Sequence, residues 1–404
     1  MLKYLLQRAG APLTVLALLI IVSAAVAKSQ ATDVSTAGQN RRLSFEVGGQ
    51  MGRLTPLAGV SGQRPMTLAL LRELPARRAG LTSVLVIGNS QTMAIMDRRP
   101  EDRLSSAWLA TTLNGWDRDE PFAVRLASEA NLTMSELLIK LAVATGDAAR
   151  RPDAVVVGIV LDGLRWVEAR ADLVALVDSD GVRGAITRAL DGPPRLVAAG
   201  RAMEEVLRTR QPVAAGGEAR PARLAAGWPI AGVERALNRQ AEAYVPLFAE
   251  RRNIQAKLRL RYTSVRNAVF GFKTTTRRPI APAMYTANLE LIEGVMRLLR
   301  EQGVRVVFYI APIRPLEPNP YHPEDVARFR RGLAGLCQRY GLPCLDYSGL
   351  VPEALWTDYP EQDASGVGGQ PDFAHFTGAA HRLLGERLAR DIRPWLEPRA
   401  AARR

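Results

Sequence analysis

The sequence predicts an α/β fold in which a parallel β-sheet is flanked by helices. Short β-branched runs alternate with amphipathic helical patterns along residues 81–164 and 281–395, as expected when crossover helices join parallel strands. Of the 404 residues, 47% are hydrophobic and 23% are charged, as in ordinary globular proteins. Collagen-like and largely disordered chains are therefore excluded, and the length suits two or three domains or one α/β domain with a long insertion.

Four short runs predict the strands. They are SVLVI at 83–87, AVVVGIV at 154–160, VRVVFYI at 304–310 and LPCLD at 342–346. Gly88 ends the first run, Pro152 precedes the second, and Pro312 stops the third. Continuous apolar runs of this length are typical of strands that are buried on both faces of a sheet.

Helical patterns separate and follow these strands. Apolar residues recur at helical spacing over 134–145, 288–302, 323–340 and 379–392, so each segment has one apolar face that can pack on the sheet. The resulting order of strands and helices predicts helices on both faces of the sheet. Ligand chemistry is then expected at the carboxyl ends of the strands.

The first 28 residues form a separate segment, 1–28. Residues 9–27 carry no charge and lie between Lys3 and Arg8 on one side and Lys28 on the other. As a helix this stretch would be about 28 Å long, close to the roughly 30 Å hydrocarbon core of a bilayer. We expect a single membrane-spanning anchor. A cleaved signal peptide is the alternative, because residues 25–27 read AVA, a small-residue cleavage pattern.

Both alternatives carry the remainder of the chain out of the cytoplasm, because the basic residues before the apolar stretch stay inside. We expect a single-pass inner-membrane protein with a periplasmic globular domain, or a secreted protein after signal cleavage. In that compartment Cys337 and Cys344 can form a disulfide, and two half-buried free thiols are the alternative. These two cysteines lack the paired spacing of a zinc site, so no metal is expected.

The remaining chain divides by composition. Residues 29–80 are polar and rich in glycine and arginine, as in a linker. The sheet-forming domain is expected in two parts, 81–164 and 281–395, on either side of a mostly helical insertion at 165–280 that contains a flexible joint at 211–221. A basic tail at 396–404 ends the chain.

The net charge of +14 implies attraction to anionic surfaces such as lipid headgroups, acidic glycans or nucleic acid. Nucleic acid is not expected, because the predicted compartment disfavours it and no basic motif is interleaved with aromatic residues. Within the insertion, residues 251–278 carry nine basic residues and no acidic one. They form either a solvated helix face or a surface for a substrate or membrane partner. The candidate surface residues are Arg251, Arg252, Lys257, Arg259 and Arg261.

A serine follows the first predicted strand. In the sequence Gly88-Asn89-Ser90, the glycine leaves backbone room for the serine Oγ to point from the carboxyl edge of the sheet, as a nucleophile requires. Gly-x-Ser tripeptides are also common in turns. A turn or helix cap is therefore the alternative role of Ser90.

A second candidate lies near the other end of the chain, in the predicted loop before the last helix. There, Asp372 precedes His375 by three residues. At this spacing the carboxylate can bond the Nδ1 proton and leave Nε2 to accept a proton from a serine. The alternative is a capping aspartate beside an incidental histidine. Neither of the other two histidines, His322 and His381, has an acidic residue in this relation.

Taken together, the G-N-S and D-x-x-H motifs resemble those of the SGNH/GDSL hydrolase superfamily. The resemblance covers about residues 83–392, apart from the insertion. It implies a three-layer, flavodoxin-like α/β fold without a cofactor. It also implies that Ser90 is the nucleophile, His375 the general base and Asp372 the residue that orients the histidine.

Two blocks that supply oxyanion-hole donors in that superfamily depart from its pattern. EANLTMS at 129–135 lacks the expected glycine, and VGIVLD at 157–162 offers Asp162 without the expected asparagine. The expected donors are therefore the backbone N–H of Ser90 and a group of Asn131, for which a loop cap is the alternative. Losing one such donor costs on the order of 100- to 1000-fold in rate.

The apolar N-terminus and the segment 306–315 are similar to one branch of the superfamily. This branch comprises membrane-tethered proteins of cell-surface polymer acylation, such as the alginate O-acetyltransferases and the D-alanylation protein of teichoic acids. The resemblance implies an O-acyltransferase, with acetyl the expected group, or an acyl esterase, acting on a cell-envelope or secreted polysaccharide beside a membrane-bound O-acyltransferase. A non-catalytic protein that docks this membrane partner is the alternative.

Overall fold

The computed structural model describes residues 80–208, 264–359 and 368–396, except for 96–98, 100, 117–120, 175, 178–179 and 193. The chain divides into two compact units, and all the strands and helices named below belong to the larger one. Among the helices that the structure describes, none combines the length and the apolar character needed to cross a membrane. The predicted anchor at 1–28 lies outside the described residues.

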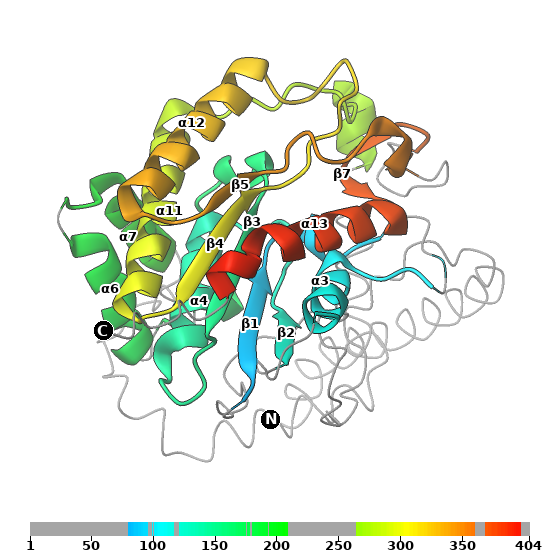
Figure 1. Cartoon of the computed structure of the whole chain (residues 1–404). Helices are drawn as coiled ribbons and strands as arrows, with labels where there is room; N and C mark the ends of the chain where they lie inside the picture. The colour runs from blue at the N-terminus through cyan, green and yellow to red at the C-terminus, as the bar shows by residue number, and fades with distance from the viewer. Residues whose placement is uncertain are drawn as a thin grey trace, which may run out of the picture. The chain divides into compact units, whose positions relative to one another are not determined.

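A five-stranded parallel sheet forms the centre of this unit (Figure 1). Its strands are β1 (Thr82–Ile87), β2 (Phe122–Leu126), β3 (Ala154–Ile159), β4 (Arg305–Ile310) and β5 (Cys344–Asp346). Their order is β2-β1-β3-β4-β5, and all neighbours pair in parallel. The sheet therefore grows from β1 toward β2 on one side and through β3 to β5 on the other. The carboxyl ends of β1 and β3 mark the switch point where ligands bind in open α/β sheets.

Helices cover both faces of the sheet (Figure 1). On one face lie α3 (Ser105–Asn114) and α13 (Gly378–Leu396), and on the other lie α4 (Met134–Gly146), α11 (Pro282–Glu301) and α12 (Pro323–Tyr340). Successive side chains of β1 point to opposite faces of the sheet and pack against both helical layers. Val84 and Val86 pack with α3 and α13, whereas Leu85 and Ile87 pack with α4 and α11. This arrangement confirms the predicted α/β class with a parallel sheet flanked by helices.

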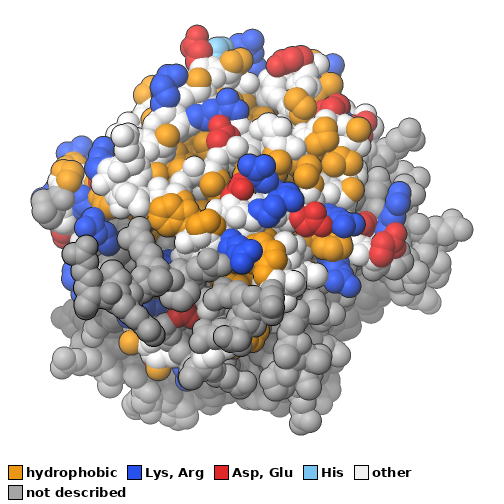
Figure 2. All heavy atoms as spheres, viewed as in Figure 1, with side chains coloured by type: hydrophobic (Ala, Val, Ile, Leu, Met, Phe, Trp, Pro, Cys, Tyr) orange, Lys and Arg blue, Asp and Glu red, His pale blue; other side chains and the backbone are white. Residues whose placement is uncertain are grey.

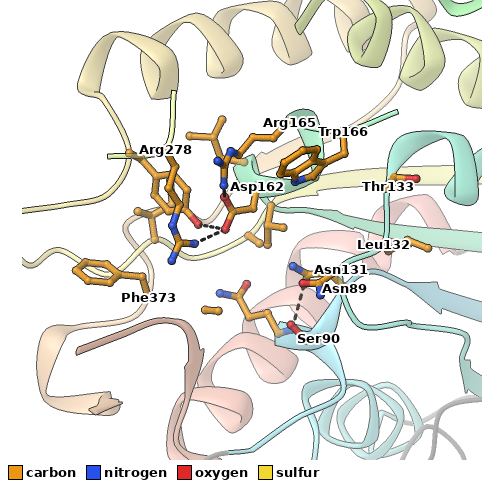
Figure 3. A pocket seen from close by; sticks show the side chains of 18 of the residues that line it. Asn89, Ser90, Asn131, Leu132, Thr133, Asp162, Arg165, Trp166, Arg278 and Phe373 are labelled. Carbon is orange, nitrogen blue, oxygen red and sulfur yellow. Dashed lines mark hydrogen bonds and ion pairs between the residues drawn. The ribbon is translucent and has the colours of Figure 1, made fainter. Parts of the chain in front are cut away.

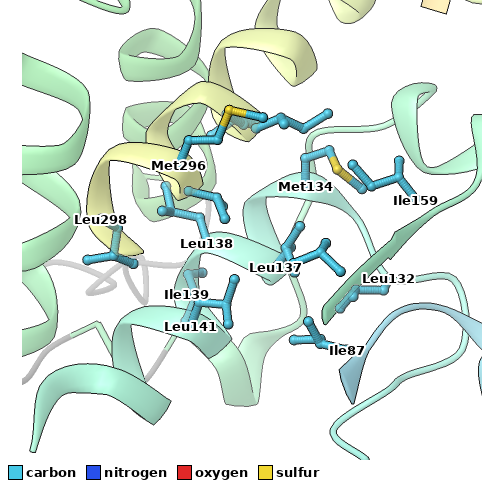
Figure 4. Packing of buried hydrophobic residues seen from close by; sticks show 14 of the residues in the cluster. Ile87, Leu132, Met134, Leu137, Leu138, Ile139, Leu141, Ile159, Met296 and Leu298 are labelled. Atoms are coloured by element: carbon cyan, nitrogen blue, oxygen red, sulfur yellow. The ribbon is translucent and has the colours of Figure 1, made fainter. Parts of the chain in front are cut away.

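The helix α4 is buried on nearly all sides because it is an inner helix. Leu137, Leu138, Ile139 and Leu141 are all buried, and Figure 4 shows them pointing to different sides, some toward the sheet and some toward α11. Besides the sheet, α4 contacts α11 and α6 (Asp180–Asp191). A helix enclosed in this way has no solvated polar face, and its two buried charged residues are paired, Lys140 with Glu129 and Glu136 with Arg170.

Three helices lie in the described part of the predicted insertion. It contains α5 (Ala171–Val174), α6 and α7 (Val197–Arg208), and both α6 and α7 pack against α11. These helices thus extend the helical layer on the α4 face and belong to the same compact unit as the sheet. The joint at 211–221 lies outside the described residues. The same holds for five predicted surface residues: Arg251, Arg252, Lys257, Arg259 and Arg261.

Two features differ from the sequence prediction. The edge strand β2 was not among the four predicted strands, because Arg125 interrupts its short apolar run FAVRL. In addition, the prediction placed Asp372 and His375 in a loop, whereas both lie on β7 (Pro371–Phe376). This strand pairs antiparallel with β6 (Trp356–Asp358). The partner strand is far enough away in the chain that no local pattern reveals the pairing.

Cys337 and Cys344 form a disulfide. Cys337 lies in the last turn of α12 and Cys344 begins β5. Between them, Gly341 adopts φ of 63° and caps the helix, a left-handed conformation that glycine adopts without steric cost. The disulfide therefore ties a sharp helix-to-strand connection at both ends.

On the face shown in Figure 2, the described basic residues do not form a single patch. There, Lys and Arg side chains lie scattered among acidic, apolar and neutral ones. The net charge of +14 belongs to the whole chain, and on the described part of this face it produces no single-sign field.

Candidate active site

A cavity of about 350 Å³ opens at the carboxyl edge of the sheet. Its walls come from the segments that follow β1, β2, β3 and β4, together with part of β7 (Figure 3). It therefore lies at the switch point defined by the strand order. Its volume falls within the range of small-molecule sites.

Ser90 lines this cavity at the start of the 3-10 turn η2 (Ser90–Thr92), directly after β1. The Oδ1 of Asn89 accepts a hydrogen bond from the Gln91 backbone N–H at 3.0 Å. The Gln91 side chain donates to the carbonyl of Pro312 at 3.0 Å. These contacts fix the turn between the ends of β1 and β4, so the position of Ser90 is determined by the sheet.

Gly88 is required by close packing at this turn. A Cβ at this position would lie 2.8 Å from Cγ2 of Thr92 and 3.3 Å from the carbonyl oxygen of Gly158. The glycine thus lets η2 fold back against the end of β3. This is the physical reason for the Gly-x-Ser pattern in this chain.

Asp372 and His375 form a hydrogen-bonded pair on β7. The Nδ1 of His375 lies 2.8 Å from Oδ2 of Asp372, whose other oxygen accepts from the backbone N–H groups of Ala374 at 2.7 Å and His375 at 3.1 Å. Asp372 is fully buried. Because the carboxylate accepts, Nδ1 carries the proton, and Nε2 is the acceptor nitrogen of the neutral ring.

The Nε2 of His375 is buried and has no hydrogen-bond partner among the described residues. β7 contacts η2, and Phe373 and Ala374 share the cavity wall with Ser90. Two segments from opposite ends of the described chain thus meet at one edge of the sheet. Within the described residues, no hydrogen bond joins Ser90 to His375, and catalytic contacts of this kind often tighten only when substrate binds.

Arg314 holds the β6–β7 hairpin to the end of β4, and sequence analysis assigned it no role. Its Nη1 donates to the carbonyls of Thr357 at 2.7 Å and Asp372 at 3.3 Å, and its Nη2 donates to Glu353 at 2.6 Å. Burial opposes its charge, yet hydrogen bonds to Glu353 and Asp358 raise the pKa of Arg314 above its ordinary value. No local pattern identifies such a residue, because its partners lie in two later segments of the chain, at 353–358 and at 372.

Asn131 lies in the cavity wall in a left-handed conformation, with φ of 53°. Asparagine tolerates this region better than other residues with a side chain. The loop without the expected glycine therefore keeps a backbone shape that glycine usually provides. The capping box of Thr133 and Glu136 starts α4 immediately afterwards and fixes the end of this loop.

Asp162 also lines the cavity, but it does not replace the missing asparagine donor. Its carboxylate accepts from Nη1 of Arg278 at 2.5 Å, from the hydroxyl of Tyr321 at 3.0 Å and from Nη1 of Arg165 at 3.5 Å. An ionised carboxylate only accepts hydrogen bonds. The candidate oxyanion donors therefore remain those of Ser90 and Asn131.

The other two histidines serve elsewhere. His381 is fully buried in α13, where its Nε2 donates to the carbonyl of Ala94 at 2.9 Å and its Nδ1 accepts from the Ser105 backbone N–H at 3.2 Å. Burial lowers the pKa of His381 to about 4. His322 precedes α12 and lies 4.0 Å from Glu324 near the surface.

Across the described ranges, no three His, Cys, Asp or Glu side chains are grouped so that they could hold a metal ion. The polar groups of the cavity are instead three hydroxyls, side-chain amides, an indole N–H, two guanidinium groups and one carboxylate. Such a set suits acyl transfer through a serine.

No known family model matches the sequence, and no curated protein matches it either. Among solved structures, a Bacteroides fragilis protein provisionally described as an acylhydrolase matches at 11% identity and a TM-score of 0.31, covering 82% of this chain and 95% of that one. A second structure matches at 12% identity and a TM-score of 0.30, covering 78% of this chain and 99% of its own. Likenesses this low carry no functional argument, so the chemistry of the site rests on its own geometry.

Proposed function

We propose that this protein is a serine-dependent acyltransferase or esterase of the SGNH type. Ser90 is the nucleophile, His375 the general base and Asp372 the orienting carboxylate. The observation that carries the proposal is His375, whose Nδ1 is held by a buried carboxylate at 2.8 Å while its buried Nε2 lacks a partner among the described residues. A serine hydroxyl is the partner that completes this arrangement.

The reaction proceeds in two halves. Ser90 Oγ attacks an acyl carbonyl while Nε2 of His375 takes the hydroxyl proton, and Asp372 stabilises the imidazolium that forms. The tetrahedral oxyanion is held by the N–H of Ser90 and by Asn131. Collapse then breaks the ester bond, and the leaving alcohol takes the proton from His375. A sugar hydroxyl or water repeats these steps in reverse on the acyl-serine.

We further propose that the acceptor is a cell-envelope or secreted polysaccharide and that the protein works beside a membrane-bound O-acyltransferase. The uncharged stretch at 9–27 supports an anchored or exported protein. The acyl-serine is common to transfer and hydrolysis. Whether sugar or water resolves it depends on how well a bound acceptor excludes water from the cavity.

The purified chain mixed with 4-nitrophenyl acetate tests the proposal. A burst of nitrophenol and an acetylated Ser90 peptide in mass spectra are expected, and both should be absent from the S90A variant. Adding an oligosaccharide acceptor distinguishes the two outcomes, because a transferase yields acetylated sugar and an esterase yields acetate. Absence of any acyl-serine from the wild-type chain would rule out the enzymatic role.

The second candidate function is a non-catalytic protein that docks the membrane acyltransferase. Asp162, which cannot act as an oxyanion donor, favours it. Polymer acylation in cells carrying S90A at normal protein level separates the two candidates. Loss of acylation supports the enzyme, and unchanged acylation supports the docking role.

A further inference from the structure

The cavity wall across from Ser90 carries a surplus of positive charge. Arg165, Arg278 and Asp162 are the charged residues that line the cavity, and Figure 3 shows them grouped on the side away from Ser90. Two guanidinium groups thus share one carboxylate. The cavity has a formal charge of +1 before any ligand enters.

The protein holds Arg278 firmly at this place. Its Nη1 bonds Asp162 at 2.5 Å, and its backbone N–H donates to the carbonyl of Pro320 at 2.9 Å. The hydroxyl of Tyr321 donates to the same carboxylate oxygen at 3.0 Å. Although burial opposes the charge, the neighbouring Asp162 raises the pKa of Arg278 above its ordinary value, so the guanidinium stays protonated.

Arg278 nevertheless has N–H groups that can bind a ligand. A guanidinium has five N–H donors, and the side-chain hydrogen bonds of Arg278 to other described residues engage Nη1 alone. Its side chain is 27% exposed and that of Arg165 is 26% exposed. Both are thus partly desolvated but reachable from the cavity. A partly buried cation in excess over its partners is best compensated by an anion with which it forms charge-assisted hydrogen bonds.

An exposed aromatic ring lies beside the arginines in this wall. Trp166 is 54% exposed at the cavity, and the guanidinium of Arg165 lies 5.4 Å from its ring centre. In Figure 3, Trp166 lies to the right of Asp162, and Phe373 lies to the left, below Arg278. A ligand here therefore presents a negative group to the two arginines and an apolar face to Trp166.

We infer that this wall is a subsite for one carboxylate-sized anionic group on the ester substrate, bound by Arg278 with help from Arg165. The inference rests on the proposed function and narrows its substrate class to esters that carry a negative charge. This charge lies close enough to the acyl carbonyl that both groups fit in the same cavity. Asp162 and Tyr321 are then positioning residues that hold Arg278 for the incoming anion.

Two matched pairs of esters test this. In one pair the charge lies on the alcohol: acetyl esters of 4-hydroxybenzoate and 4-hydroxybenzamide. In the other it lies on the acyl group: 4-nitrophenyl esters of succinate and succinamate. In at least one pair, kcat/KM of the wild-type chain should favour the anionic ester by about 10-fold or more, the range expected for a charge-assisted hydrogen bond. The pair that shows the preference tells which half of the substrate carries the charge.

The R278Q variant should lose this preference, with kcat/KM for the anionic ester falling about 10- to 100-fold and that for the neutral ester changing less than about threefold. R278K should keep part of the preference, and R165Q covers the case in which R278Q fails to fold. R188Q removes the same charge at an exposed site paired with Glu301 and should behave like wild type. No preference in either pair, or a preference that persists in R278Q and R165Q, overturns the inference.

Binding to the S90A variant separates this inference from the proposed function. Calorimetry with 4-hydroxybenzoate and 4-hydroxybenzamide, and with succinate and succinamate, needs no turnover. Tighter binding of an anion that is lost in S90A/R278Q supports the subsite even if the wild-type chain proves inactive. Equal binding within both pairs contradicts the subsite even if the enzyme is active.

Discussion

The Asp372–His375 pair shows how one residue determines what another can do. Asp372 is fully buried, bonds Nδ1 of His375 at 2.8 Å and accepts two backbone N–H groups with its other oxygen. These contacts hold the carboxylate still and select the ring tautomer. An amide in its place can present an N–H to Nδ1 and favour the wrong tautomer.

The D372N variant should therefore lower kcat for ester cleavage by about 10³- to 10⁴-fold with little change in KM. Steady-state kinetics with 4-nitrophenyl acetate measure both constants. D147N, at an exposed carboxylate, is the control and should be unaffected. A kcat for D372N within about threefold of wild type would contradict the proposed role of this pair.

His381 should make stability depend on pH. Burial lowers its pKa to about 4 in the folded protein, compared with about 6.5 when unfolded. Between these values the unfolded chain binds the extra proton, so the free energy of unfolding should fall as the pH drops from about 6.5 to about 4, by a few kcal/mol. Urea unfolding at a series of pH values measures this slope.

The H381Q variant should lose that slope between pH 6.5 and 4, and H322Q, at a surface position, should keep it. An unchanged slope in H381Q would show that other groups produce the acid sensitivity. Because His381 joins the loop at Ala94 to the first turn of α3, H381Q should also be less stable than wild type at pH 7.

At the scale of elements, α3 and α13 approach each other closely at Gly385. A Cβ there would lie 2.4 Å from the carbonyl oxygen of Ser105 and 3.0 Å from the backbone N of Leu109. Backbone atoms cannot give way as a flexible side chain can. The contact between these helices therefore depends on a glycine in the middle of α13.

G385A should lower the free energy of unfolding by about 1–3 kcal/mol, because the added methyl group separates two packed helices. G335A in α12 is the matched control, because nothing lies within 4 Å of a Cβ at that position. That variant should gain stability by about 0.4–1 kcal/mol. Denaturant unfolding of both variants gives the comparison, and equal effects would mean that the helix contact at Gly385 can relax.

Elements also differ in how well local patterns predict them. α12 begins at Pro323 and ends at Tyr340 as predicted, because proline suits the first helical turn and Gly341 suits the left-handed cap. The three long central strands follow prediction within two residues, since strands buried on both faces read as continuous apolar runs. β2 and β7 were missed because polar residues interrupt both and their strand character depends on a partner strand.

At the scale of the whole molecule, the disulfide joins the helical layer to the edge of the sheet. It closes a short loop, with a sequence separation of 7 between Cys337 and Cys344. Reduction, or the C337S/C344S double variant, should lower the free energy of unfolding by about 2–3 kcal/mol. Denaturant unfolding with and without reductant measures this change. Because neither cysteine lines the cavity, catalytic activity should be unchanged at denaturant concentrations below the unfolding transition. A loss of activity without unfolding would show that β5 influences the site.

The sequence alone determined the features that depend on neighbours along the chain: the buried strands, the capped helices and the D-x-x-H spacing that lets Asp372 reach His375. Only the tertiary structure decided which distant segments meet. The strand order brings Ser90 and β7 to one edge of the sheet, Arg314 ties the hairpin there, and Arg278 reaches the cavity from beyond the helices α6 and α7 in sequence. The physical reason is that local patterns reflect interactions over one or two turns, whereas these meetings depend on how whole elements pack across the sheet.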